Sequence, residues 1–221
     1  MNFDVVLEQL RVRLAEPLPG ASAHALMAPR PRREWPAGFD AANIRHAAGL
    51  LLVFPLNSRA HIVLTVRADT LGRHGGQVSL PGGVAEPGET FEQAALREAH
   101  EEVALAPGDV RVLGALTPLD IPVSGFRLHP VVAVANVRPM LRPADGEVAM
   151  ILEVDIAELS DPLRVVVTPR VRDGREVMVP AFRVGGADIW GATAMVLAEF
   201  LALLGRTPGA AVSEPRPLIP S

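Results

Sequence analysis

Residues 83–105, GVAEPGETFEQAALREAHEEVAL, set a turn directly before a short helix that is rich in glutamate. Pro87 and Gly88 are typical of a turn, and Thr90 followed by Gln93 is the capping-box pattern that starts a helix. Apolar residues recur at helical spacing after Thr90 and form one stripe. The segment therefore predicts a helix that packs on a sheet through this stripe.

Three carboxylates lie along the border of that stripe. Glu98, Glu101 and Glu102 stand three and four residues apart, so at ~100° per residue they share an arc of about 100°. Arg97 lies four residues before Glu101, a spacing that predicts a contact between the two. A solvated acidic surface is one interpretation. A site for a hard divalent cation is the other, because Mg²⁺ and Mn²⁺ prefer oxygen ligands.

The stretch resembles the Nudix box, G-x5-E-x7-R-E-U-x-E-E-x-G-U, in which U is a bulky aliphatic residue. The matching residues are Gly83, Glu89, Arg97, Glu98, Glu101, Glu102 and Leu105. Ala99 is smaller than the usual aliphatic residue, and Ala104 replaces the glycine after the helix. The second change removes the residue that adopts a left-handed C-terminal turn most easily, so the helix is expected to end differently.

The resemblance implies an α/β (α+β) fold, a Nudix-type α/β/α sandwich around a mixed β-sheet. It also implies a pyrophosphohydrolase that uses Mg²⁺ or Mn²⁺, in which water attacks a phosphorus atom of a diphosphate. The implied metal ligands are Glu98, Glu101 and Glu102, with Glu89 as an outer support.

A glutamate outside the motif is a further candidate. Glu147 lies in a loop before a strand, where many Nudix enzymes place an additional metal ligand or the general base; a plain loop residue is the alternative. The catalytic candidates are therefore Glu101, Glu147 and Arg97.

The segment before the motif, residues 67–83, RADTLGRHGGQVSLPGG, resembles the signature of coenzyme A pyrophosphatases. It departs at Gly72, where the signature has arginine, and at Leu80, where it has an aromatic residue. The candidates for contact with substrate phosphate are Arg67, Arg73, His74, Gln77, Gly82 and Gly83. A basic run at residues 30–33 is another candidate or a solvated linker.

This second resemblance favours coenzyme A or an acyl derivative as substrate, with 3′,5′-ADP and (acyl-)4′-phosphopantetheine as the implied products. ADP-ribose, a dinucleotide or a nucleoside triphosphate is the alternative substrate. A Nudix-fold module that senses a nucleotide without hydrolysing it is an alternative of another class.

Composition excludes several classes of protein. The 221 residues are 49% hydrophobic and 21% charged, which argues against wholesale disorder. A net charge of −4 gives no electrostatic case for a nucleic-acid partner, and the lack of cysteine excludes disulfides and thiolate metal sites. No apolar run approaches the ~18 residues of a membrane span. We expect a cytoplasmic enzyme that acts on a small nucleotide substrate. The sequence does not decide whether it is a monomer or a homodimer.

The pattern along the chain predicts mostly strands between two helices. The helices are expected at residues 3–15 and 191–204, in addition to the one after Thr90. The strands are expected at residues 46–56, 61–67, 110–116, 128–137, 148–154, 163–171 and 176–184, the last two joined by a hairpin turn at Asp173-Gly174. The expected organisation is an N-terminal helix and proline-rich segment (1–44), a Nudix domain (45–205) and a flexible tail (206–221).

Overall fold

The central element of the computed structural model is an eight-stranded sheet; the structure describes residues 1–68, 76–144, 146–172 and 174–208. Its strands are β1 (Arg45–Leu56), β2 (Arg59–Arg67), β3 (Val78–Ser79), β4 (Gly82–Val84), β5 (Val110–Ala115), β6 (Leu119–Ile121), β7 (Phe126–Ala135) and β8 (Val148–Asp155). The main path runs β3-β2-β1-β7-β5, while β4 pairs with β1, β6 with β7 and β8 with β2. Among the strands that the structure describes, β1 and β7 are the one parallel pair, so the sheet is mixed, as predicted.

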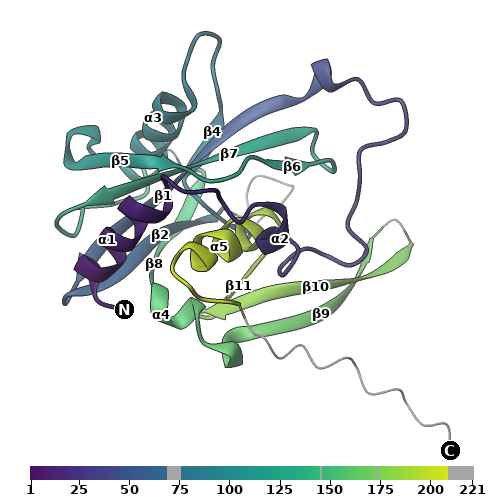
Figure 1. Cartoon of the computed structure of the whole chain (residues 1–221). Coiled ribbons are helices and arrows are strands. Elements are labelled where there is room, and N and C mark those ends of the chain that lie inside the picture. Colours follow the sequence, from purple (N-terminus) through teal and green to yellow (C-terminus); the bar gives the residue numbers. More distant parts are fainter. Residues whose placement is uncertain (69–75, 145, 173, 209–221) are drawn as a thin grey trace, which may run out of the picture.

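Strand β1 is buried on both faces, which its apolar sequence predicts. Leu50 and Leu52 join one hydrophobic cluster, together with helix α3 (Phe91–Val103). Leu51 and Val53 point the other way, into a cluster with α1 (Phe3–Arg13) and α5 (Ala192–Leu203). Alternate residues of one strand thus serve opposite faces. Helices cover both sides of the sheet (Figure 1), which confirms the α/β/α sandwich.

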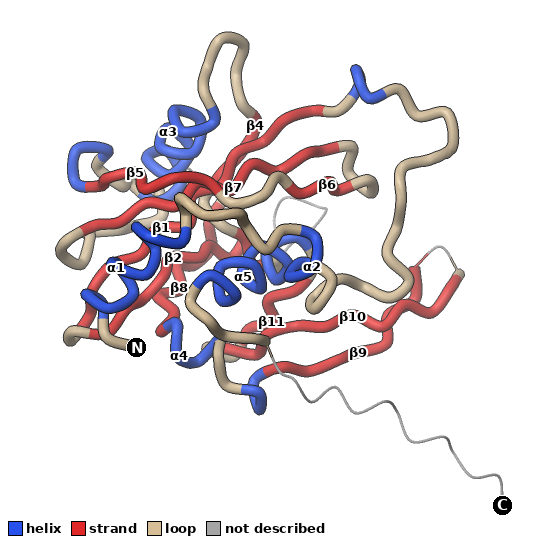
Figure 2. The backbone as a smooth tube through the Cα atoms, viewed as in Figure 1, coloured by secondary structure: helices blue, strands red, loops and turns tan. Residues whose placement is uncertain are grey.

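The predicted hairpin is present and belongs to a second sheet of three antiparallel strands. These strands are β9 (Val165–Arg172), β10 (Arg175–Val184) and β11 (Ala187–Trp190). Strand β11 was not predicted, because four residues are too few for a clear alternation. Phe182 of β10 and Ile189 of β11 share a cluster with α5, so this helix packs against both sheets (Figure 2).

The other predicted elements are confirmed with ends shifted by a few residues. Helix α1 begins at Phe3 after the cap Asn2, and the proline-rich segment is irregular apart from α2 (Ala21–His24) and the 3₁₀ turn η1 (Ala41–Asn43). The remaining short helices are α4 (Ile156–Leu159), η3 (Pro107–Asp109) and η4 (Pro162–Arg164). Most of the predicted tail, residues 209–221, lies outside the described residues. No helix in the described part of the chain is both long and apolar enough to cross a bilayer.

A buried carboxylate ties the N-terminal segment to the last helix. Glu199 of α5 is fully buried, and it accepts hydrogen bonds from the backbone N–H of Gly20 (2.9 Å), from His24 Nε2 (2.9 Å) and from the Thr117 hydroxyl (2.6 Å). Burial alone would raise the pKa of Glu199, but the hydrogen bonds from His24 and Thr117 outweigh it and hold the pKa below its usual value. Sequence reasoning did not single out this network.

Candidate active site

Helix α3 begins and ends through local contacts. The Thr90 hydroxyl accepts from the Gln93 backbone N–H (3.2 Å) and the Gln93 side chain accepts from the Thr90 N–H (2.9 Å), which confirms the predicted capping box. At the other end Ala104 adopts the left-handed conformation (φ 55°, ψ 29°) although it is not glycine. The helix therefore ends as it would with glycine, and the expectation of a different ending is wrong. His100 Nδ1 donates to the Leu105 carbonyl (2.9 Å) just beyond this turn.

Arg97 is the centre of the polar face of α3. Its Nε and NH2 groups donate to both oxygens of Glu89, at 3.0 and 3.2 Å. Its NH1 group donates to Glu98 Oε1 (2.9 Å) and to Glu101 Oε2 (3.2 Å), so the predicted contact with Glu101 is present. Hydrogen bonds from Arg97 hold the pKa of Glu89 below its usual value, and Glu89 in turn raises the pKa of Arg97. One guanidinium thus fixes three carboxylates.

The glycines of β4 let the helix approach the sheet. A Cβ atom on Gly82 would lie 2.2 Å from the Ala48 carbonyl oxygen of the neighbouring β1. A Cβ atom on Gly83 would lie 2.5 Å from the carboxyl carbon of Glu98. The backbone N–H of Gly82 donates to Glu102 Oε2 (3.1 Å). Glu98 therefore occupies the space that any side chain at Gly83 would need, whereas Glu102 is held by the backbone N–H of Gly82.

Glu147 and Arg67 form a separate pair. Arg67 NH2 lies 3.2 Å from Glu147 Oε2, and both side chains are about half exposed. The Glu147 carbonyl also accepts from the Ala68 N–H (2.7 Å), which fixes the end of β2 against the start of β8. The carboxylate is accessible to water and is oriented by a cation.

The NUDIX domain family model matches residues 45–174, more than half of the chain. The chain belongs to the Nudix family. Proteins named as uncharacterized Nudix hydrolase NudL are similar to it: that of Klebsiella pneumoniae strain 342 is 33% identical over 188 residues, 85% of this chain and 94% of the relative. That of Citrobacter koseri is 31% identical over 176 residues, 74% of this chain and 85% of the relative. The solved Nudix hydrolase RenU of M. smegmatis covers 53% of this chain with a TM-score of 0.47.

Membership establishes the class of reaction. The chain is a Nudix pyrophosphohydrolase, which cleaves a diphosphate bond in a small nucleotide derivative. Nudix hydrolases in general use divalent metal ions for this reaction.

The acidic face of the Nudix helix fits a divalent ion by its chemistry. Glu98, Glu101 and Glu102 offer only carboxylate oxygens, the ligands that hard cations prefer. The three carboxylates do not form a coordination shell in this structure, because the described residues contain no group of three His, Asp or Glu side chains placed to hold one ion. Arg97 holds Glu98 and Glu101 instead. An ion would have to compete with Arg97 for their oxygens, and the assignment of these ligands stays a prediction.

The residues predicted to contact phosphate lie in two different parts of the structure, and two of them lie outside the described residues. Gly82 and Gly83 lie beside the carboxylates, whereas Gln77 lies at the start of β3. The Gln77 carbonyl accepts from the Arg67 N–H (3.0 Å), so Gln77 adjoins the Arg67–Glu147 pair. Arg73 and His74 lie outside the described residues.

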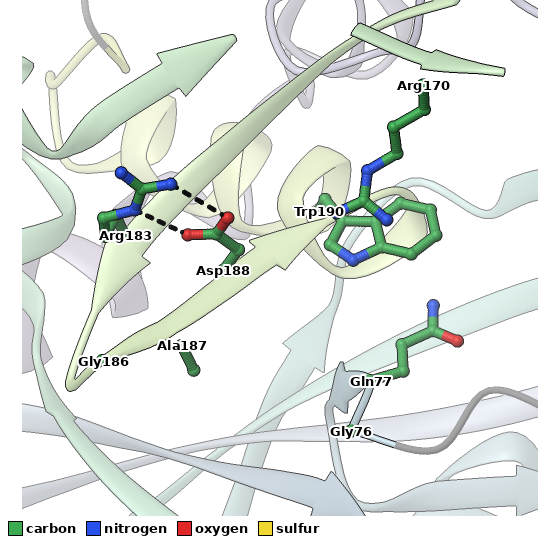
Figure 3. Close-up of a pocket in the computed structure, with 8 residues that line it drawn as sticks. All are labelled: Gly76, Gln77, Arg170, Arg183, Gly186, Ala187, Asp188 and Trp190. Atoms are coloured by element: carbon green, nitrogen blue, oxygen red, sulfur yellow. Dashed lines mark hydrogen bonds and ion pairs between the residues drawn. The ribbon is translucent and has the colours of Figure 1, made fainter. Parts of the chain in front are cut away.

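Gln77 also lines a cavity of about 570 Å³ that sequence reasoning missed. The opposite wall is the three-stranded sheet, which contributes Arg170, Arg183, Asp188 and Trp190 (Figure 3). Trp190 is partly exposed in this wall. The available signal was two arginines on the predicted hairpin close to a tryptophan, and only the pairing of β9, β10 and β11 brings them together.

Proposed function

We propose that this Nudix hydrolase cleaves the diphosphate of coenzyme A or of an acyl-coenzyme A in the presence of Mg²⁺ or Mn²⁺. The products would be 3′,5′-ADP and (acyl-)4′-phosphopantetheine. The choice of substrate is supported by the resemblance of residues 67–83 to the coenzyme A pyrophosphatase signature. ADP-ribose, dinucleotides and nucleoside triphosphates are the alternative substrates of the same chemistry.

The observation that carries the proposed chemistry is the arrangement of Glu98, Glu101 and Glu102 on one side of α3. Glu98 and Glu102 are set against the backbone of β4, while Glu101 is 53% exposed and open to a ligand. In the proposal these three side chains hold the divalent ion. When bound, the ion would neutralise phosphate oxygens and lower the pKa of a bound water molecule.

The other residues have positioning and proton-transfer roles in this proposal. Arg97 orients Glu98 and Glu101 through NH1, and Glu89 holds Arg97 in place as an outer support. Glu147 serves as the general base, and Arg67 orients its carboxylate at 3.2 Å. A base of this kind must reach the attacking water, and the half-exposed carboxylate of Glu147 meets that requirement.

The test is a screen for product release from nucleoside diphosphate derivatives with Mg²⁺ or Mn²⁺, in which Glu101→Gln is compared with the native chain. We expect Glu101→Gln to keep the fold and to lower kcat by orders of magnitude, because an amide offers the cation less negative charge. Glu92→Gln is the matched control, because Glu92 lies in the first turn of the same helix, away from the three ligands. Native turnover by Glu101→Gln at saturating Mg²⁺ would contradict the metal assignment.

Two expectations from the sequence remain part of the proposal, a cytoplasmic location and the absence of a nucleic-acid partner. A nucleic-acid titration at low salt tests the second expectation, because electrostatic binding is strongest there. The choice between a monomer and a homodimer stays open, and sedimentation analysis decides it.

A further inference from the structure

We propose that the cavity between Gln77 and the three-stranded sheet is a phosphate-binding subsite in which Arg170 contacts a phosphate monoester remote from the scissile diphosphate. The inference rests on the proposed function, because a substrate with such a phosphate is one that resembles coenzyme A. It goes beyond that function by assigning the recognition to strands β9–β11, most of which lie beyond the residues that the family model matches.

Arg170 is the side chain in this cavity that is best placed to bind an anion. Its guanidinium carbon lies over the Trp190 ring, 4.3 Å from the ring centroid, in a cation–π contact. This contact leaves the N–H groups at the edge of the plane available for hydrogen bonds. Asp188, the carboxylate in the same wall, forms its salt bridge with Arg183 (Figure 3), although the charge of Arg170 also helps to lower the pKa of Asp188.

Arg183, the second arginine of the cavity, is already paired with a carboxylate. Arg183 donates to both oxygens of Asp188, from Nε at 2.8 Å and from NH2 at 3.2 Å. That bidentate pair largely neutralises itself. The remaining charge in the cavity wall is that of Arg170, so an anion that enters the cavity meets a positive centre.

Two of the arginines expected from the sequence have other partners. Arg67 is paired with Glu147, and Arg32 donates to the Asp120 carbonyl at 3.4 Å. A phosphate monoester carries about 1.5–2 negative charges at neutral pH and accepts several hydrogen bonds. Arg170 is therefore better suited to contact it than either of these two residues.

The cavity lies within reach of the Nudix helix. Gln77 in its wall and Gly82 beside Glu102 are five positions apart in the sequence, and at ~3.3 Å per residue the two are no more than roughly 17 Å apart. A substrate whose diphosphate lies at the carboxylates could place a second phosphate in the cavity. At about 570 Å³ the cavity has room for more than the phosphate alone.

The test compares binding of 3′,5′-ADP and 5′-AMP by calorimetry, with the full chain and without metal. We expect Arg170→Ala to weaken 3′,5′-ADP binding by about tenfold or more, the loss of a charge-assisted hydrogen bond, and to change 5′-AMP binding less than about twofold. Arg170→Lys, which keeps the charge but not the planar fork, is expected to lie between. Arg175→Ala is the control, because Arg175 is exposed on the same hairpin and does not line the cavity.

Equal binding of 3′,5′-ADP by the native chain and Arg170→Ala would overturn the inference, and so would no binding by the native chain or an equal loss for both ligands. The hydrolysis screen separates this result from the proposed function. If Arg170→Ala loses 3′,5′-ADP selectively but the native chain does not cleave coenzyme A, the subsite stands and the proposed substrate is wrong. If coenzyme A is cleaved and the selective loss is absent, the reverse holds.

Discussion

The carboxyl group of Glu98 occupies the space in which a side chain at Gly83 would begin, because a Cβ atom there would lie 2.5 Å from the carboxyl carbon. The conflict is steric, since Gly83 is not among the glycines with positive φ. Glycine at this position therefore serves the placement of a carboxylate on α3.

We expect Gly83→Ala to displace Glu98 and to lower kcat at least tenfold, with a smaller effect on the free energy of unfolding, because the side chain of Glu98 can rotate outward. Kinetics and urea unfolding measure the two effects. Gly108→Ala is the control, because a Cβ atom on Gly108 would meet no atom within 4 Å. Native kcat in Gly83→Ala would show that the position of Glu98 does not matter for turnover.

For Glu147 we expect Glu147→Gln to lower kcat by about 10²–10⁴-fold, the usual contribution of a general base, with the substrate KM little changed. The amide keeps the shape of the side chain but cannot accept the proton. Steady-state kinetics check this, with Glu8→Gln, a change of an exposed residue on α1, as the control. An unchanged kcat would mean that Glu147 is not the general base.

Ala104 offers a test of stability. Its left-handed conformation costs an alanine about 1–2 kcal/mol, whereas glycine adopts it without that cost but adds about 0.4–1 kcal/mol of unfolded-state entropy. We expect Ala104→Gly to raise the free energy of unfolding by about 0.5–1 kcal/mol in urea. Ala106→Gly, at a φ of −77°, should lower it instead. Destabilisation by both would refute the strain at Ala104.

His129 predicts a dependence of stability on pH. Burial first, and then the charges of His46 and Arg127, lower the pKa of His129 to about 4, while Asp120 opposes the shift. The unfolded chain, with a histidine pKa of about 6.5, binds more protons than the folded chain between pH 6.5 and 4. Stability should therefore fall as the pH falls through this window.

His129→Gln removes this titration, so its stability should fall less steeply than that of the native chain over the same window. Thermal unfolding of both proteins at several pH values measures the difference. Parallel pH profiles would mean that His129 is not the group responsible. Phe91, which stacks on His129 at 3.5 Å between ring centroids, is unchanged in both proteins.

The local features of the site could be predicted from the sequence. The capping box at Thr90 and the contact between Arg97 and Glu101 depend on spacings of three and four residues within one helix, which α-helical geometry fixes. The four-residue strand β11 and the two-residue strand β3 could not, because so short a segment carries no periodicity.

The cavity and the place of Arg170 in it could not be predicted from the sequence for another reason. Arg170 and Trp190 are on different strands, and they meet only because β10 pairs with both β9 and β11. The contacts of Glu199 could not be predicted either, since a single acidic residue in an apolar helix gives no information about which residues it contacts. Such contacts are fixed by the packing of distant elements, for which one sequence supplies no spacing rule.

The carboxylate of Glu199 has a consequence for the order in which the chain assembles. Its contact with Gly20 joins residues 179 positions apart, so it cannot form until nearly all of the chain has left the ribosome. Until then the segment around Gly20 and His24 lacks its hydrogen bonds to Glu199. A shortened chain that starts at residue 45 would never gain them, and Glu199 would lose the hydrogen bonds from Gly20 and His24. Glu199 of α5 thus joins a late part of the chain to an early one.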